Sequence, residues 1–259
     1  MLQVGRRWMV ALLGGCVMAA AGCAAVPQTP SLFPVLTQRS PAARAQVVQE
    51  RATSVQTLSA LLAVSYSRGS QHGTFDLIVN YAAPSTLRFT ALKDTVLHTK
   101  MLFDLLVQQE TYRFVRYEDA GALFQQGLAQ DFLHDHPMFR TFVLVGEAFL
   151  VPGVAHDGQP PQVNNAGTRL RTALRHGVHA QWRSHAETLE IFRACLRMQT
   201  AAETIALTLD YREYRRVDTH YLPHQVTLHD RRAGFTVHAV VKEVTVNEPL
   251  APDVFVLTP

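Results

Sequence analysis

The residues best suited to chemistry lie in one short stretch, where two aspartates and two histidines fall within six positions. Asp131, His134, Asp135 and His136 could supply carboxylate and imidazole ligands to a metal ion, and a helix would place Asp131 and His134 on one face. Zinc sites use three or four such ligands with ordered partners behind them, and the sequence indicates no further ligand. We therefore expect no metal and no other cofactor.

The remaining reactive side chains form no catalytic motif. His220 and His224 have the spacing of two ligands on one helix face, but Pro223 between them argues against a helix. The sequence lacks a His-Glu-x-x-His, Cys-x-x-Cys or Gly-x-Ser-x-Gly motif and a glycine-rich phosphate loop. We therefore expect no catalytic residues and predict that the protein is not an enzyme.

Cysteine chemistry is confined to the N-terminal region. Cys16 and Cys23 lie in or directly after an apolar stretch, and Cys195 stands alone in the rest of the sequence. A disulfide framework is therefore excluded, and Cys195 is expected to act as a small buried apolar residue.

The apolar stretch runs from Trp8 to Ala21 and follows two basic residues, Arg6 and Arg7. Its fourteen residues are too few for a bilayer core, which takes about 20 residues. They suit the apolar core of a secretory signal peptide instead.

Small residues lead up to a cysteine in Ala20-Ala21-Gly22-Cys23. This motif resembles the lipobox of bacterial lipoproteins, in which a peptidase cuts before the cysteine and the thiol receives diacylglycerol. The resemblance implies that residues 1–22 are a signal peptide and that Cys23 is lipidated and anchors the protein to a membrane. Two other interpretations stay open: an ordinary signal peptide cut near Ala19–Ala21, or an uncleaved anchor.

The charge of the remaining chain excludes one class of partner. Loss of residues 1–22 removes Arg6 and Arg7, which lowers the formal charge from +3 to +1. A nearly neutral protein has no electrostatic reason to bind nucleic acid. Residues 23–41 contain four prolines and one arginine, a composition typical of an extended tether. Residues 23–259 are long enough for one large domain with its own core or for two small domains.

The elements that follow the tether are a helix and a series of strands. Ser40 and Pro41 predict a helix start, and the helix from Ala42 to about Val55 has one apolar face. From Thr57 the apolar period changes to two, which predicts a meander of about six antiparallel strands over residues 57–117. These strands begin with a hairpin that turns at residues 67–70, and they include one at Thr95–Thr99.

The pattern changes between two strand-rich blocks. Residues 120–133 predict a short helix, and residues 138–150 are so apolar that they should be buried. We expect a helical insert at about 119–150 and further strands from Arg169 to Val246. The simplest fold is mainly β (α+β), an unclosed antiparallel β-barrel or curved sheet with helices covering its concave face.

Short motifs then indicate a family. Tyr221-Leu222-Pro223, a later strand that runs into Val246-Asn247-Glu248-Pro249-Leu250, and Phe255 resemble the closing segment of the LolA/LolB-like lipoprotein carriers and receptors. Pro84-Ser85-Thr86-Leu87-Arg88 resembles another of their segments. The resemblance implies one LolA/LolB-like domain over 42–259, with an apolar cavity that holds the acyl chains of lipoproteins or related lipids.

The resemblance also implies a site and a location. Ala24 follows Cys23 where an aspartate would favour retention in the inner membrane, so we expect a lipid-anchored protein of the outer membrane facing the periplasm. The loop at Ser67–Gly73 lacks the large apolar residue of the receptors, which favours lipid binding, or a structural role on the same fold, over lipoprotein insertion. Strand face or helix position selects eight candidate cavity residues: Leu77, Val79, Leu87, Phe89, Phe103, Phe139, Phe142 and Phe149.

Two functions remain open at this stage. The first is a carrier or receptor whose partners are a membrane, through Cys23, and a lipid or lipoprotein ligand. The second is a scaffold lipoprotein that uses the same fold to dock an envelope protein. The residues at 138–150 could equally be plain core beneath the sheet, so the sequence does not decide between an open and a filled cavity.

Overall fold

The computed structural model describes most of the chain beyond the predicted tether. The described residues are 40–95, 98–129, 131–132, 148, 151–152, 162–164, 168–174, 178–199 and 204–257. They all belong to one compact unit, residues 31–259. Cys23 and the predicted signal peptide lie outside the described residues.

The helix α1 (Pro41–Thr53) begins where the sequence predicts. Ser40 Oγ accepts a hydrogen bond from the backbone N–H of Ala43 at 3.3 Å, and Pro41 occupies the first helical position. The predicted apolar face is confirmed, because Val48, Ala52 and Val55 are all buried.

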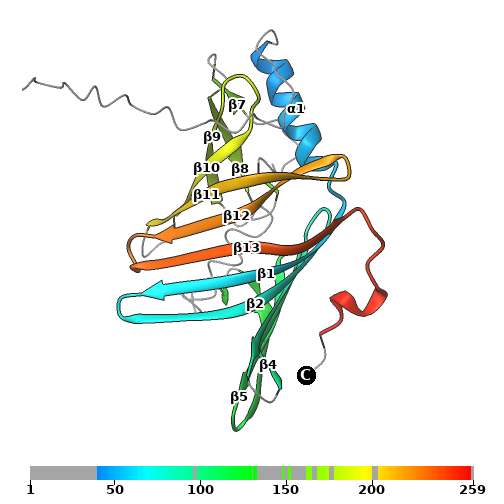
Figure 1. Cartoon of the computed structure of the whole chain (residues 1–259), viewed down its shortest axis with the longest axis vertical. Helices are drawn as coiled ribbons and strands as arrows, with labels where there is room; N and C mark the ends of the chain where they lie inside the picture. Colours follow the sequence, from blue (N-terminus) through cyan, green and yellow to red (C-terminus); the bar gives the residue numbers. More distant parts are fainter. Residues whose placement is uncertain are drawn as a thin grey trace, which may run out of the picture. The chain divides into compact units, whose positions relative to one another are not determined.

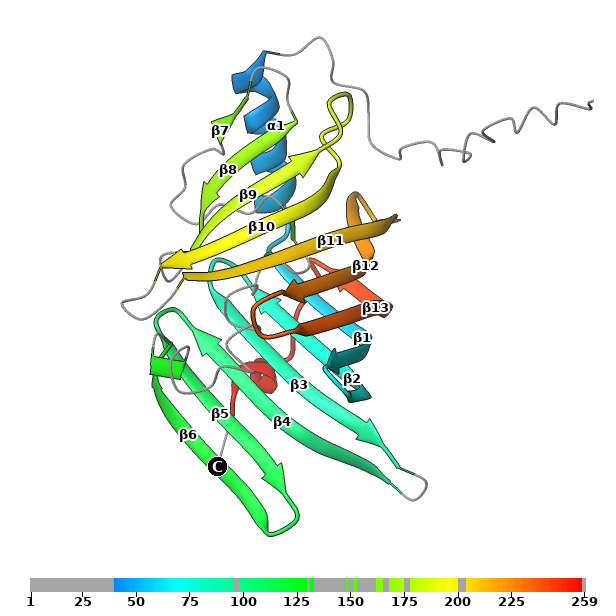
Figure 2. The ribbon, with the colours of Figure 1, turned by 90° about the vertical axis from the view of Figure 1, so that its left-hand side faces the viewer.

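The described strands form one antiparallel sheet. In chain order they are β1 (Thr57–Arg68), β2 (Gln71–Ala82), β3 (Thr86–Asp94), β4 (Thr99–Gln108), β5 (Thr111–Glu118), β6 (Gly121–Leu128), β7 (Gln162–Val163), β8 (Arg169–Ala173), β9 (Val178–Ser184), β10 (Ile191–Gln199), β11 (Thr204–Val217), β12 (His220–Asp230) and β13 (Phe235–Val246). Their order in the sheet is β6-β5-β4-β3-β2-β1-β13-β12-β11-β10-β9-β8-β7. Figure 1 shows the central strands and Figure 2 shows both ends.

Two meanders make up this sheet, and β1 joins them by pairing with β13. Neighbouring strands are also neighbours in sequence everywhere except at this junction. The predicted single sheet built from both strand blocks is therefore confirmed. The sheet is unclosed, because β6 and β7 lie at its opposite ends.

Alternation of apolar and polar residues places one apolar face inside the curve of the sheet, here called the concave face. On β1, Leu58, Ala60, Leu62 and Val64 are buried on this face and alternate with more exposed residues. The concave residues of both meanders and the apolar face of α1 belong to one hydrophobic cluster. The opposite face is here called the convex face.

The C-terminal segment covers part of the convex face. A short 3₁₀ helix, η3 (Pro252–Phe255), follows β13 and lies beside β3. Leu257 is buried with Leu106 and Val115 in a second, smaller apolar cluster. This cluster gives the N-terminal meander apolar contacts on both faces.

Two predictions about secondary structure are wrong. Residues 121–128 form β6 and not the start of a helical insert, because their main chain pairs with β5 along the whole strand. Thr95–Thr99 is not a separate strand. Thr95 Oγ1 accepts the N–H of His98 at 3.1 Å, which closes a turn between β3 and β4.

Among the described residues, α1 is the one α-helix longer than a few residues. None of the helices in this part of the chain is long and apolar enough to cross a membrane.

Candidate functional site

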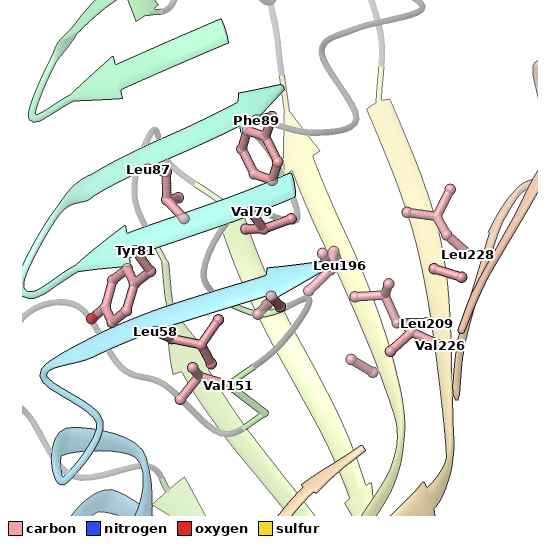
Figure 3. Packing of buried hydrophobic residues seen from close by; sticks show 14 of the residues in the cluster. Leu58, Val79, Tyr81, Leu87, Phe89, Val151, Leu196, Leu209, Val226 and Leu228 are labelled. Atoms are coloured by element: carbon pink, nitrogen blue, oxygen red, sulfur yellow. The ribbon is translucent and has the colours of Figure 1, made fainter. Parts of the chain in front are cut away.

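Five of the eight predicted cavity residues converge on the concave face. Cross-strand pairing sets Val79 opposite Phe89, and Leu77 opposite Ala91, which in turn faces Phe103. With Leu87 they all lie in the main hydrophobic cluster. Figure 3 shows Val79, Leu87 and Phe89 pointing toward side chains of the other meander. The structure therefore brings these five residues to one apolar surface.

The three phenylalanines predicted at 139, 142 and 149 lie outside the described residues, as do His134, Asp135 and His136. Both ends of the segment that contains them contact the concave face. At one end, the ring of Phe132 lies 4.7 Å from that of Tyr112 and 5.3 Å from that of Phe114. At the other end, Ala148 and Val151 are buried in the same cluster. Figure 3 places Val151 beside Leu58 of β1.

A pocket of about 80 Å³ opens between α1 and the β10–β12 region. The apolar face of α1 forms one wall, and Ile191, Tyr214 and Leu222 contribute to the opposite wall. Arg51 and His220 also line it. This volume is about half that of a cavity of roughly 150 Å³ that holds one benzene molecule. The pocket as it stands therefore admits a few carbon atoms.

Comparison with known proteins gives no match by sequence: no family model matches this chain, and no curated protein is significantly similar to it. The solved structures that share its architecture include the following three. A LolA superfamily protein from Nitrosomonas europaea is 8% identical, with a TM-score of 0.53 over 84% of this chain and 97% of that one.

A domain described as an outer membrane lipoprotein-sorting protein, from Vibrio parahaemolyticus, is 8% identical with a TM-score of 0.52 over 85% of this chain and 97% of that one. A DUF1329 family protein from Desulfovibrio piger is 12% identical with a TM-score of 0.56 over 84% and 98% of the two chains. The chain has a LolA-like fold. At such low identities the likeness establishes the fold alone.

One residue of the motif that suggested the LolA-like fold has a clear structural role. Asn247 adopts a positive φ of 59° directly after β13. Its Oδ1 accepts the N–H of Gln56 at 2.7 Å, and its Nδ2 donates to the carbonyl of Ser54 at 2.8 Å. Asparagine tolerates this backbone conformation better than most residues. Asn247 therefore fixes the junction between α1 and β1, and so positions the helix over the concave face.

Two tyrosines of β11, one buried and one partly buried, donate hydrogen bonds to main-chain atoms. Tyr211 Oη donates to the carbonyl of Ala148 at 2.6 Å, and Tyr214 Oη donates to that of Ile191 at 2.7 Å. Burial raises the pKa of both tyrosines well above 10. Their hydroxyls therefore stay protonated and serve as structural donors. Sequence reasoning missed both residues, because their partners lie 63 and 23 positions away.

The described residues of the site provide apolar surface and hydrogen bonds with a structural role. No three His, Cys, Asp or Glu side chains lie close enough to hold a metal ion within the part of the chain that the structure describes. His224 is buried on β12, and its Nδ1 lies 3.2 Å from the carbonyl of Leu222. Burial lowers the pKa of His224, so its ring is held neutral as a structural donor.

Proposed function

We propose that the protein binds the acyl chain of a lipid or of a lipoprotein against the concave face, and takes part in envelope lipid or lipoprotein trafficking. One observation carries the proposal: the inner residues of both meanders form a single apolar cluster, and a pocket reaches it beneath α1. An apolar, concave surface with few convergent polar groups suits an aliphatic guest. The non-enzymatic role of a carrier is consistent with this surface.

The guest would enter where α1 covers the sheet. The pocket is too small for a whole chain, so α1 must move outward to admit one. Two hydrogen bonds to main-chain carbonyls tie the sheet-facing side of the helix to the loop before β10: Arg51 to Thr188 at 3.0 Å and Arg44 to Ala186 at 3.4 Å. Each buried methylene of the guest contributes about 0.8 kcal/mol, and these contributions would have to offset the loss of such bonds and of the apolar contacts made by Val48, Ala52 and Val55.

The anchor and the location form part of the same proposal. Lipidation at Cys23 would hold the protein at the outer membrane facing the periplasm, within reach of lipid or lipoprotein partners. Leu77, Val79, Leu87, Phe89 and Phe103 would line the inner end of the site. Phe139, Phe142 and Phe149 stay predictions for the same site.

A second candidate, a scaffold lipoprotein that docks an envelope protein, is favoured by a different observation. Leu77, Val79 and Phe89 are each 1% exposed, as in a filled core. A filled interior leaves no room for a guest unless the covering elements separate. The two functions therefore differ in whether any lipid enters.

Native mass spectrometry of residues 24–259, purified from a lipid-containing host, tests the first function. We expect a co-purifying lipid or acylated peptide in the wild-type protein. Ala52 faces the pocket and Ala42 is exposed on the same helix. Ala52→Leu should fill the pocket and lose the guest, whereas the matched Ala42→Leu variant should retain it.

The opposite result is equally clear. An apo mass for all three proteins, even after incubation with lipids and lipopeptides, would exclude acyl-chain binding. The scaffold role would then be the better explanation. Retention of the guest by Ala52→Leu would leave lipid binding intact but place its entrance elsewhere.

A further inference from the structure

A dense group of arginines lies on the convex face at one end of the sheet, across β8, β9 and β10. These residues alternate with buried ones such as Leu170, Trp182 and Leu196, so they point away from α1 and the core. Figure 2 looks onto these three strands with α1 behind them. The group, here called the arginine face, consists of Arg169, Arg171, Arg183, Arg193 and Arg197.

Cross-strand register brings like charges directly opposite one another in the arginine face. Arg183 pairs with Arg169 on one side and with Arg193 on the other, which makes a row of three arginines across three strands. Like charges opposite one another destabilise a sheet. Repulsion within this row therefore lowers the stability of the folded state, and binding of an anionic partner would neutralise that repulsion.

Internal compensation of this charge is small. Arg193 binds Asp210 of β11 at 2.5 Å, and β8, β9 and β10 contain no acidic residue of their own. Arg169, Arg171, Arg183 and Arg197 are exposed. The formal charge of the whole sequence is only +3, so the arginine face is a local concentration of charge and not a general property.

An exposed aromatic residue adjoins the arginines. Phe192, directly before Arg193, is 36% exposed, and its ring lies 5.1 Å from that of His185. Exposed aromatic rings beside basic residues are typical of surfaces that lie in the headgroup region of a membrane.

We propose that the arginine face docks on a membrane surface that carries anionic phospholipid headgroups. The charge of the face is complementary to such a surface, and Phe192 supplies the apolar contact. The length of the segment before α1 is consistent with this proposal. Residues 23–39 lead into α1, which packs beside β7 at this end of the sheet. Fully extended, these residues would span about 55 to 60 Å, enough for an anchor in the same membrane.

This inference uses the opposite face of the sheet from the proposed acyl-chain site, and it shares with the proposed function only the anchor at Cys23. The test uses residues 24–259, which lack the apolar stretch Trp8–Ala21 and both Cys16 and Cys23, so that neither a signal peptide nor an acyl anchor contributes and Cys195 is the sole thiol. Cys195 lies within the arginine face, opposite Gln181 of β9, and is partly exposed there, so the prediction that it is a buried residue is wrong. A bimane label on Cys195 then reports contact at this face.

Flotation with vesicles gives the first readout. We expect at least about tenfold stronger binding to phosphatidylcholine mixed with phosphatidylglycerol than to phosphatidylcholine alone, and a loss of the difference at high salt. Bimane emission at Cys195 should shift with the phosphatidylglycerol vesicles.

Charge reversal gives the second readout. Arg171→Glu with Arg183→Glu should remove the preference for phosphatidylglycerol while leaving the thermal midpoint unchanged or higher, because repulsion within the row is relieved. The matched control, Arg68→Glu with Arg113→Glu, changes two exposed arginines of the N-terminal meander and should retain the preference.

Four results would overturn the proposal. Equal binding to both vesicles would remove the anionic lipid as partner. Retained preference in the Arg171→Glu and Arg183→Glu variant, or an unchanged bimane emission, would place the contact elsewhere. Capture of an acidic envelope protein without any vesicle binding would assign the arginine face to a protein partner instead.

Discussion

The N-terminal meander, β1–β6, and the C-terminal meander, β7–β13, bury their polar side chains on opposite faces of one sheet. In the N-terminal meander Thr90 and Asp104 are buried on the convex face, beneath the C-terminal segment. In the C-terminal meander Thr172 and His224 are buried on the concave face. A buried face of a strand can therefore carry polar as well as apolar side chains.

Each arrangement follows from what covers the sheet. The C-terminal segment lies on the convex face of the N-terminal meander, and Arg88 ties it there by donating to the carbonyl of Val254 at 2.6 Å. In the C-terminal meander the convex face is open and charged, and the polar groups serve the concave side. Trp182 Nε1, for example, donates to Thr172 Oγ1 at 2.9 Å. Covering segments decide where a polar residue can be buried with a partner.

The covered face should be the more sensitive to mutation, and Arg88→Ala should have the largest effect. Arg88 and Asp104 form a bidentate pair, and Asp104 is 2% exposed with Thr90 as a further donor. Removing the arginine leaves a buried carboxylate without its cation and also frees the C-terminal segment. We expect a loss of about 3 kcal/mol in the free energy of unfolding, measured with urea.

An exposed ion pair of the same meander supplies the control. Lys100 binds Asp119, whose side chain is 96% exposed. Lys100→Ala should therefore leave the free energy of unfolding unchanged. Equal losses in the free energy of unfolding for Arg88→Ala and Lys100→Ala would show that the covered face is no more sensitive to mutation than the exposed surface.

Leu257→Ala tests the apolar part of the same cover. Leu257 is 4% exposed and packs with Leu106 and Val115. Its truncation should cost about 2 kcal/mol, at the low end for buried leucines because the cluster is small and near the chain end. Val256, its neighbour, is 52% exposed, and Val256→Ala should cost less than about 0.5 kcal/mol. Similar losses for both variants would mean that the C-terminal segment does not cover the sheet.

Tyr211→Phe tests a buried polar group of the C-terminal meander. The change removes the bond to the carbonyl of Ala148 and leaves that buried acceptor without this donor. We expect a loss of about 1 to 2 kcal/mol, together with faster hydrogen exchange near Ala148. A loss near zero would indicate that the segment at Ala148 is held by apolar contacts alone.

The parts of the fold that could be predicted from the sequence are those set by local pattern. Period-two alternation predicted the β1–β2 hairpin, and Ser40 with Pro41 predicted the start of α1. The concave positions of Leu77 and Val79 followed from the same alternation. These features depend on residues within one strand or one turn, so the sequence contains enough information to predict them.

The parts that could not be predicted depend on distant residues. Strand β6 lacks alternation, since Leu123 is exposed on one face while Phe124 packs under the C-terminal segment on the other. Arg88 and Asp104 are 16 positions apart, and the tail they hold is about 150 positions further on. The row of arginines exists only because of strand register, which a sequence without the fold does not give.

The smallest expected effect is a pH dependence that belongs to the concave face. A carbonyl oxygen only accepts, so His224 Nδ1 carries a proton toward Leu222, and burial lowers the pKa of the ring. The unfolded state therefore binds a proton at a higher pH than the folded state does. The contribution of neutral His224 to the free energy of unfolding is fully present above the unfolded pKa of about 6.5 and is lost as the pH decreases through the lowered folded pKa.

His224→Gln should flatten this fall in urea unfolding measured between neutral and mildly acidic pH. His72→Gln, an exposed change in the β1–β2 hairpin, should leave the slope as in the wild type. An identical slope of the free energy of unfolding against pH in the wild type and in His224→Gln would mean that protonation of His224 does not destabilise the folded state.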